Sequence, residues 1–439
     1  MTPSDALAAL RVHAPLSIAE RRAALGKLVA ALRARAPEMV AAAAADYGRR
    51  SELDTLLADN LIVQDAAKHA RRWLGWWARW RGQSVPYPFW PARAWVEPMP
   101  KGVVGIMAPW NYPFQLALMP AVDALAAGNR IVVKPSEFTP RCAALLAEIL
   151  ATLGDDVARV VQGDATVAAD FAAQPWDHLV FTGGTDTGRR VAAAAAPNLT
   201  PLTLELGGKC HAIVAPGADL ARAAKDILVA KMINAGQTCV APDTVLLVGH
   251  PVQEFIAAAR AARLGPGETE VVNDAQRERL VRLTEGATLT ALPGGIALAE
   301  APDGHPMHAS EIFGPVLGLR ACTSMQDATR IVAIGEAPLA VYLFGATRDE
   351  EALVAGFTRS GAIVTERAVE FAAFHAVPFG GVGASGYGRR GGRAGFMEFS
   401  NLRLRVRHGR WAMSRMFDAP RTEKALAMAR RLVGIKPKA

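Results

Sequence analysis

Cysteine is scarce in this sequence. Its 439 residues include four widely spaced cysteines, Cys142, Cys210, Cys239 and Cys322. The first ten residues carry Asp5 and lack a basic stretch followed by an apolar core, so they do not resemble a secretory signal. A disulfide framework is therefore not expected, and we expect reduced thiols in the cytoplasm. At least one of these thiols is then available for chemistry.

Long uncharged runs are also rare. Residues 103–122 carry no charge and are about long enough to cross a bilayer. They contain Pro109, Pro113 and Pro120, each of which would remove a helix hydrogen bond or clash with the preceding turn. Two amide side chains in the run would be costly in lipid. We expect buried irregular backbone and the start of a helix here, and no transmembrane segment.

The sequence lacks a convincing metal pattern and a strong nucleic-acid signal. Among the nine histidines, His305 and His308 have the most suggestive spacing, but Pro306 between them suits a loop. The formal charge of +8 permits attraction to anionic cofactors, membranes or nucleic acid without identifying any of them. Arginines and tryptophans share residues 71–81 in the pattern of a packed amphipathic helix. We expect neither a metal nor a nucleic-acid partner.

Apolar residues make up 51% of the chain, enough for an extensive core. Alanine-rich periodic segments predict long helices over residues 18–45 and 51–80, the second one capped by Ser51. Prolines in residues 82–100 predict an extended arm or hairpin. The basic, partly amphipathic tail 421–439 is typical of a surface helix, and contact with a membrane surface is a second hypothesis.

From Gly102 onward, strand patterns alternate with helical patterns, which is typical of right-handed βαβ units in a parallel sheet. The first set predicts strands at 103–107, 130–133, 157–161 and 178–182 and helices at 139–153 and 165–173. A second set begins near Lys209, with strands at 212–214 and 244–248 and helices at 219–234 and 251–263. The sequence therefore predicts two α/β domains.

Three residues are candidates for catalysis. Cys239 follows a predicted helix and precedes a strand, so it lies on a supported loop where a nucleophile is useful, although most loop cysteines are inert. Glu205 ends a strand before a glycine pair and could act as a general base, or simply pair with Lys209. Asn111 stands between two prolines, where its amide could donate to an oxyanion or merely satisfy a loop.

Two further segments suit a dinucleotide. Gly183, Gly184 and Gly188 lie between a strand and a helix expected to begin near Thr187, and glycine backbone at a helix N-terminus suits a pyrophosphate. The spacing departs from the Gly-x-Gly-x-x-Gly fingerprint, so the signal is weak by itself. Lys134 and Glu137 follow another strand and could hold ribose hydroxyls, or form a capped turn.

Taken in order, these segments resemble the aldehyde dehydrogenase superfamily and, within it, the class 3 enzymes, a group that includes coniferyl aldehyde dehydrogenases. The resemblance covers nearly the whole chain and is carried by residues 109–113, 134–137, 181–188, 205–209, 234–239, 311–315 and 378–383. It implies an α/β fold with a Rossmann-like dinucleotide-binding domain, an α/β catalytic domain and a small β oligomerisation arm. The implied boundaries are 1–208 for the first domain, with 82–100 as the arm, and 209–384 for the second. Residues 385–439 would return to the cofactor domain and supply an oligomerisation strand and the basic tail.

The same resemblance implies a mechanism. Cys239 would attack the aldehyde carbon, and the Asn111 side chain with the Cys239 backbone N–H would stabilise the oxyanion. The thiohemiacetal would give up hydride, and the thioester would be hydrolysed by water that Glu205 activates. A free thiol with a pKa of about 8.5 is only slightly ionised at neutral pH, so local activation is expected.

For the cofactor, the resemblance implies that Lys134 and Glu137 contact the adenosine ribose and that Gly183, Gly184 and Gly188 approach the pyrophosphate. Glu311 and Phe313 would position the nicotinamide end. Glu137 favours NAD because a carboxylate repels a 2′-phosphate, and NADP is the second candidate. The resemblance further implies a homodimer, paired through residues 82–100 and 402–408.

Several departures from the family pattern bear on the substrate. The interval from Cys239 to Glu311 looks short, residues 264–306 show no clear strands, and we expect part of the substrate funnel to be missing. Residues 364–366 lack an expected asparagine, residues 389–393 replace a tyrosine-histidine pattern, and Gly184 stands where many relatives have serine. The leading hypothesis is NAD(P)-dependent oxidation of a hydrophobic or aromatic, coniferyl aldehyde-like, small molecule to its acid. The alternative is a cofactor-binding oligomer with lost or regulatory activity.

Overall fold

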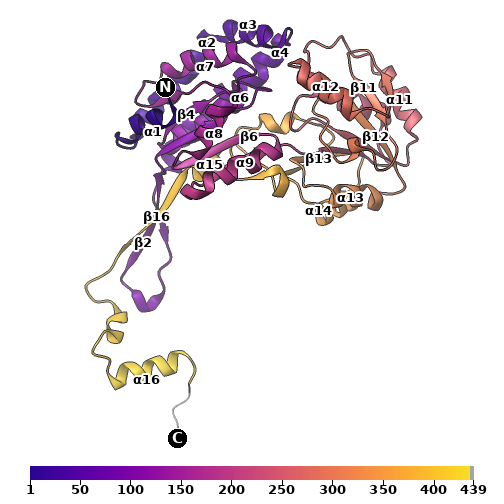
Figure 1. Ribbon diagram of the computed structural model, residues 1–439. Coiled ribbons are helices and arrows are strands. Elements are labelled where there is room, and N and C mark those ends of the chain that lie inside the picture. The colour runs from indigo at the N-terminus through magenta and orange to yellow at the C-terminus, as the bar shows by residue number, and fades with distance from the viewer. Residues whose placement is uncertain (436–439) are drawn as a thin grey trace.

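The structure is a computed structural model that describes residues 1–435. Figure 1 shows two α/β bodies side by side and a long arm that extends away from the first body. The first body contains a six-stranded sheet, the second a seven-stranded sheet, and the arm a three-stranded sheet. The α/β fold with a β arm that the sequence predicts is confirmed.

The six-stranded sheet has the order β15-β7-β6-β3-β4-β5. Its strands are β3 (Val103–Met107), β4 (Arg130–Lys134), β5 (Ala158–Val160), β6 (His178–Gly183), β7 (Leu202–Leu206) and β15 (Gly386–Tyr387). All pairs are parallel except β15 with β7. The chain builds outward from β3 in one direction and then from β6 in the other. The carboxyl ends of β3 and β6 therefore meet at the point where a parallel sheet opens a ligand crevice.

Both faces of this sheet are covered, so its strands are continuous apolar runs. One face packs on α2 (Ile18–Ala34), α3 (Ala36–Tyr47), α5 (Ile62–Trp77), α6 (Gln115–Ala127), α7 (Pro140–Ala151) and α15 (Gly392–Glu398). The other packs on α1 (Pro3–Arg11), α8 (Ala165–Ala173) and α9 (Thr185–Ala195). Every residue of α6 is buried, so it forms the centre of this body.

The seven-stranded sheet has the order β10-β11-β12-β9-β8-β13-β14. Its strands are β8 (His211–Val214), β9 (Thr244–Val248), β10 (Thr288–Ala291), β11 (Ala297–Glu300), β12 (Val316–Cys322), β13 (Ala340–Phe344) and β14 (Ala362–Thr365). Helices α10 (Leu220–Met232) and α11 (Val252–Ala261) cover one face, and α13 (Met325–Ile334) and α14 (Arg348–Phe357) cover the other. Helix α12 (Asp274–Leu283) lies near β11 and β12.

The arm consists of β1 (Arg81–Gln83), β2 (Arg93–Pro100) and β16 (Ser400–Arg407), all antiparallel. Beyond β16 the chain continues through the short helix η8 (Met413–Phe417) to α16 (Glu423–Leu432), which lies at the far end of the arm in Figure 1. The hairpin expected over residues 82–100 is confirmed. Residues 436–439 of the predicted basic tail lie outside the described residues.

Other short elements connect these units: α4 (Glu52–Asp54), η1 (Thr55–Leu61), η2 (Tyr87–Phe89), η3 (Ala196–Asn198), η4 (Ile233–Gly236), η5 (Pro306–His308), η6 (Glu370–Ala373) and η7 (Gly383–Ser385). Within residues 1–435, no helix has the length and apolar character needed to cross a bilayer. The same part of the chain contains no group of three or more metal-ligating side chains.

Several sequence expectations were wrong in detail. The helix expected over 18–45 is two helices, because Pro37 begins a new one after Arg35. The helix expected over 51–80 is α4, η1 and α5, although Ser51 does cap its start. Helix α9 begins at Thr185 rather than near Thr187. Residues 264–306 do contain regular structure, namely α12, β10 and β11.

Candidate active site

Cys239 lies on a tight loop between α10 and β9. The three residues Asn234, Ala235 and Gly236 all have positive φ, at 51°, 52° and 69°. Such backbone persists only where its surroundings hold it. The Asp54 carboxylate accepts the Asn234 backbone N–H at 2.9 Å, and the Gln237 side chain donates to two carbonyls and accepts the Val272 N–H at 3.0 Å. The loop is therefore fixed from several sides, and Cys239 is left partly exposed at its end.

Asn111 follows β3 and lies against this loop. Its side-chain Nδ2 donates to the Gln237 carbonyl at 3.1 Å, and its backbone carbonyl accepts the Asn234 Nδ2 at 2.8 Å. The Asn111 amide has two N–H groups, and the Gln237 carbonyl uses one of them. Asn111 and Cys239 line the same cavity. The structure thus brings Asn111 and Cys239 together, although 128 sequence positions separate them.

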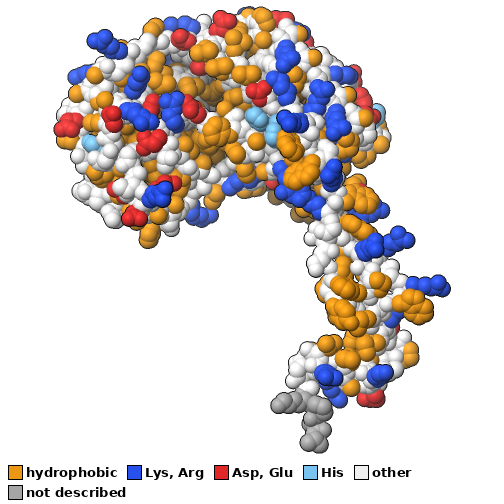
Figure 2. Space-filling view, turned by 180° about the vertical axis from the view of Figure 1, so that it is seen from behind, with side chains coloured by type: hydrophobic (Ala, Val, Ile, Leu, Met, Phe, Trp, Pro, Cys, Tyr) orange, Lys and Arg blue, Asp and Glu red, His pale blue; other side chains and the backbone are white. Residues whose placement is uncertain are grey.

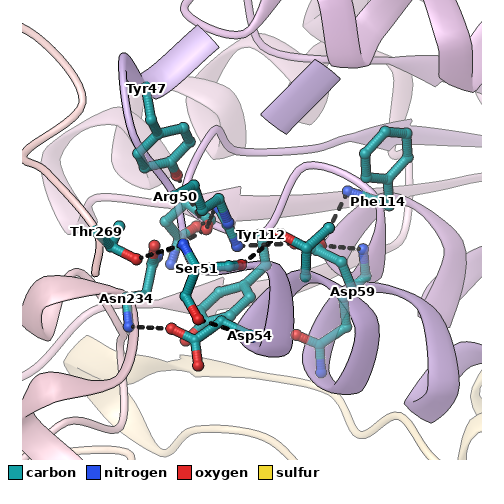
Figure 3. Close-up of polar contacts among 12 residues, drawn as sticks. Tyr47, Arg50, Ser51, Asp54, Asp59, Tyr112, Phe114, Asn234 and Thr269 are labelled. Atoms are coloured by element: carbon teal, nitrogen blue, oxygen red, sulfur yellow. Dashed lines mark hydrogen bonds and ion pairs between the residues drawn. The ribbon is translucent and has the colours of Figure 1, made fainter. Parts of the chain in front are cut away.

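A buried polar network supports both residues (Figure 3). Arg50 and Asp59 form an ion pair of 2.7 Å in which neither side chain is exposed. Arg50 also donates to the Asn111 carbonyl at 2.9 Å, and Asp59 accepts the backbone N–H groups of Phe114 and Gln115 at 3.2 and 2.9 Å. The carboxylate of Asp59 therefore caps the start of α6 while Arg50 holds the loop before it.

Two cavities meet at Cys239. The first, of about 410 Å³, lies along the carboxyl ends of β3, β6 and β7 and is lined by Asn111, Gly183, Gly184, Glu205, Glu311 and Phe313 among others. The second, of about 340 Å³, is mostly apolar and is lined by η1, the start of α5, η6 and Phe379. Of the described residues that line these cavities, Leu116 and Cys239 belong to both.

Glu205 forms a buried ion pair with Arg390, whose Nε lies 2.7 Å from the Glu205 Oε1. Both side chains are more than nine-tenths buried. Arg390 also lies over the Phe379 ring, 4.2 Å from its centroid, and lines the apolar cavity while Glu205 lines the other one. The alternative partner considered for Glu205, Lys209, instead pairs with Asp243.

The electrostatics of the site keep the thiol protonated. Burial, together with the carboxylates Glu311 and Glu205, raises the pKa of Cys239 to about 12, and Arg390 opposes this only in part. Burial also raises the pKa of Glu205, with Arg390 acting in the other direction. The protein groups around Cys239 therefore do not supply the activation expected for its thiol.

Glu311 and Phe313 lie on the loop before β12. Burial, and then Asp243, raise the pKa of Glu311 to about 8. The Phe313 ring meets Trp110 edge to face with centroids 5.5 Å apart, and its backbone has a φ of 48°. Arg279 of α12 fixes the loop by donating to the carbonyls of Ile312 and Phe313 at 2.7 and 3.1 Å. A Cβ at Gly207 would overlap the Glu311 carboxylate, so a larger residue there would displace that side chain.

The glycine segment 183–188 forms the other wall of the first cavity. Gly184 is the N-cap of α9 and offers no side chain to the helix, so the first-turn N–H groups lack a cap. The space around Gly184 is open, whereas a Cβ at Gly188 would meet the Leu206 side chain. Gly188 therefore serves the packing of α9 on β7 and does not line the cavity.

Lys134 and Glu137 lie at the carboxyl end of β4, and the structure does not place them on the cavity wall. Lys134 Nζ donates to Glu137 Oε2 at 2.8 Å, with the lysine buried and the glutamate partly exposed. Their strand is the neighbour of β3 in the sheet, so both lie at the same sheet edge as Asn111.

Sequence reasoning missed several residues that build this site. Arg50, Asp54 and Asp59 support the loops, Arg390 pairs with Glu205, and Arg279 and Gln276 line the first cavity. Two signals in the sequence lay near these residues. One was the cap at Ser51, and the other was the departure from the family pattern at residues 389–393. From the sequence we expected part of the substrate funnel to be missing in residues 264–306. None of these residues lines the apolar cavity.

The crevice at the sheet edge thus leads to a cysteine that lines the same cavity as a buried carboxylate. The chain belongs to the aldehyde dehydrogenase family, whose profile matches residues 3–404. It is 38% identical over 417 residues to a coniferyl aldehyde dehydrogenase of Pseudomonas sp. strain HR199, covering 89% of this chain and 86% of that one. It is 34% identical to aldehyde dehydrogenase family 3 member A2 of Rattus norvegicus, covering 71% and 68%. The family resemblance and the enzyme class expected from the sequence are confirmed.

Solved structures agree. The substrate-bound state of Staphylococcus aureus AldH superposes with a TM-score of 0.88 at 28% identity, covering 93% of this chain and 94% of that chain. An NAD-dependent aldehyde dehydrogenase from Sinorhizobium meliloti gives a TM-score of 0.84 at 25% identity, covering 93% and 88%. The protein is therefore an aldehyde dehydrogenase in both sequence and fold.

Proposed function

We propose that this enzyme oxidises a hydrophobic or aromatic aldehyde, of the coniferyl aldehyde type, to the carboxylic acid with NAD. The observation that carries the proposal is the position of Cys239, where an apolar cavity meets the crevice at the sheet edge. The 38% identical relative named for coniferyl aldehyde supports the substrate class. NADP is the second candidate cofactor.

The residues present fit a dinucleotide. The uncapped first turn of α9 at Gly184 offers backbone N–H groups to a pyrophosphate in open space. Gly183 lies beside it, with Gly188 packing the helix close to β7. Glu311 and Phe313 would hold the nicotinamide end, and Lys134 and Glu137 the adenosine ribose. When bound, NAD supplies the oxidant that takes hydride from the substrate carbon.

The protein residues divide the remaining work. Cys239 first loses its proton to solvent; its Sγ then adds to the aldehyde carbon, and the aldehyde oxygen becomes negative. The second N–H of the Asn111 amide and the Cys239 backbone N–H, which faces its own sulfur, stabilise that oxygen. After oxidation the acyl group remains on Cys239 as a thioester. Glu205 takes a proton from water, the hydroxyl attacks the acyl carbon, and the acid leaves as the thiol is restored.

The apolar cavity defines the substrate class. Leu57, Leu61, Ile62, Tyr112 and Phe379 are among the apolar and aromatic residues of its wall, and they suit a flat or aliphatic group of limited size. The charged residues of this wall are Asp54, Glu370 and Arg390, so its acidic side chains outnumber its basic one and disfavour an aldehyde that carries a carboxylate.

The cofactor unit is assigned to residues 1–208, with the arm 82–100, and the catalytic unit to residues 209–384. Residues 385–439 return to the first unit, and the β15–β7 pair at Gly386 and Glu205 supports this boundary. Arg390 on the returning segment thereby reaches the base that lies at the end of β7.

The test is the formation of reduced cofactor by the purified protein with NAD or NADP and coniferyl aldehyde, benzaldehyde or hexanal. Turnover with the aromatic aldehydes that disappears in Cys239→Ala is expected, with cofactor binding retained because the variant leaves the crevice intact. Cofactor binding without turnover across the panel would overturn the proposal in favour of an oligomer with lost or regulatory activity.

A further inference from the structure

Arg390 is a cation in an unusual place. Figure 2 shows lysine and arginine side chains projecting from the outer surface of both bodies, which is the ordinary location of such charges. The side chain of Arg390 is instead only 5% exposed, and it lies in the wall of the apolar cavity that meets Cys239. Of the described residues that line this cavity, Asp54 and Glu370 are the other charged ones, and Glu370 is exposed. The cavity therefore has a positive charge in its buried part and a negative charge at its mouth.

The backbone around Arg390 is fixed by three hydrogen bonds. The Arg390 N–H and carbonyl pair with the backbone of Phe379, both at 2.9 Å, and the Phe379 ring lies beneath the guanidinium. The next residue, Gly391, donates its N–H to the buried Asp123 carboxylate at 2.9 Å. A Cβ at Gly391 would overlap the Val377 carbonyl, and the φ of 93° at this position also favours glycine. A well-held backbone therefore presents the Arg390 side chain to the cavity, as a binding group requires.

The ion pair with Glu205 leaves hydrogen-bonding capacity of this guanidinium unused. Arg390 Nε lies 2.7 Å from Glu205 Oε1, but within the described chain it is buried without a hydrogen-bond partner, because its N–H is not directed at that oxygen. A guanidinium has five N–H donors, arranged as a fork that matches a carboxylate. An anion with two oxygens that enters the apolar cavity therefore finds donors that Glu205 does not use.

We propose that Arg390 binds the carboxylate of the acid that the enzyme forms. This inference rests on the proposed function, in which the acyl group on Cys239 is hydrolysed with Glu205 as the base. The acyl carbon is attached to the Cys239 sulfur, and the positive charge of Arg390 acts at that sulfur, where it opposes the rise in the pKa of the thiol. The carboxylate is therefore formed within the field of this guanidinium, in the cavity that Arg390 lines.

The proton balance of hydrolysis explains how Arg390 changes partners. Water gives one proton to Glu205 and its hydroxyl to the acyl carbon. The C–S bond then breaks with its electron pair on sulfur, and the hydroxyl proton passes to that sulfur. At this point Glu205 is neutral, Cys239 is a thiol and the acid is a carboxylate, so the negative charge beside Arg390 has moved from Glu205 to the product. When Glu205 loses its proton to solvent, its carboxylate competes for Arg390 and the acid is released.

Two other oxygen groups are less suited to Arg390. The aldehyde oxygen carries no net charge, so it gains less from a guanidinium than a carboxylate does. A carboxylate at the far end of the substrate stays near the mouth of the cavity when the reacting end is at Cys239, and there it meets the exposed Glu370. The carboxylate formed at the reacting end is the anion that matches the charges of the cavity.

The experiment is calorimetric titration of the full chain at neutral pH with benzoate and with benzamide, a neutral molecule of the same shape. Wild type is expected to prefer benzoate at least about tenfold, because hydrogen bonds between two charged groups are the stronger ones. The preference should vanish in Arg390→Gln and remain in part in Arg390→Lys. Glu205→Gln should bind benzoate at least about tenfold more tightly than wild type, because no carboxylate then competes for Arg390.

Arg282→Gln is the matched control, because it removes an exposed arginine that does not line the cavity, and it should bind benzoate like wild type. NAD binding by each variant reports whether the crevice is intact. A preference for benzoate that survives in Arg390→Gln, or binding in Glu205→Gln that is no tighter than in wild type, would overturn the proposal. Aldehyde turnover is measured separately. Absent turnover with the expected order of benzoate binding would contradict the proposed function alone, and turnover without that order would contradict only the role of Arg390.

Discussion

At the residue scale, Glu205 is held between two opposing influences. Burial favours its neutral form, and Arg390 at 2.7 Å favours the carboxylate, which is the form that the proposed base needs. In Arg390→Gln the pKa of Glu205 should rise further, so a higher pH is needed to ionise it. The rising limb of the kcat against pH profile is expected to move to higher pH, with the rate at neutral pH reduced.

Arg390→Lys is the matched control for this change, because it keeps a positive charge while removing the planar guanidinium. In Arg390→Lys the rising limb of the kcat against pH profile should lie between the positions found for wild type and for Arg390→Gln. A profile that stays in place in Arg390→Gln would show that the pair is structural only and that some other group sets the ionisation of the base.

Cys239 offers a second test at this scale. Glu311 and Glu205 both raise the pKa of its thiol, and Arg390 lowers it. Glu205→Gln removes one negative charge and also frees Arg390, and both changes favour the thiolate. Alkylation of Cys239 by iodoacetamide should therefore be faster at pH 8 in Glu205→Gln, although aldehyde turnover falls. A slower alkylation would contradict the charge balance described for the site.

At the scale of elements, Asp59 links η1 to the start of α6. Asp59→Asn would leave Arg50 charged, fully buried and without its partner. Breaking such a pair costs about 3–5 kcal/mol, so the free energy of unfolding should fall by that amount in chemical denaturation. Arg282→Gln, which removes an exposed pair with Glu278 on α12, should stay within about 0.5 kcal/mol of wild type.

The elements that the sequence predicted well are those with strong local signals. Strands β3 and β9 and helix α8 have the expected bounds, because apolar runs end at clear turns and Asp164 caps α8. The break at Arg35 was missed because alanine-rich sequence is helical on both sides of it. Strands β10 and β11 were missed because each is four residues long and gains its stability from pairing beside β12.

The candidate site shows the same division. Cys239, Glu205 and Asn111 were found from glycine and proline neighbours that mark supported loops. Asp59 has no such neighbours, and the glycines around Arg390 did not reveal its role, because the importance of both residues arises from partners 9 and 185 positions away that only folding brings into contact. A buried ion pair is a tertiary property, so a lone arginine in sequence does not reveal it.

At the scale of the whole molecule, the arm predicts an oligomer. Strand β16 exposes Leu402, Leu404 and Val406 at 50%, 60% and 47%, and their alternate spacing puts them on one face. We expect a homodimer that covers this face. Leu404→Asp should shift the molar mass in light scattering toward the monomer at micromolar concentration, whereas Ile334→Asp on α13 should not. A wild-type monomer at that concentration would contradict the prediction.

The meeting of the two cavities at Leu116 and Cys239 also has a kinetic consequence. On the proposed function we expect the aldehyde and the nucleotide to reach the sulfur by separate routes, so that neither must leave for the other to enter. The acid can depart through the apolar route while the nucleotide is still held. In such an enzyme both reactants can be bound at the same time. Double-reciprocal plots of the initial rate, measured while both reactants are varied, should therefore give intersecting rather than parallel lines.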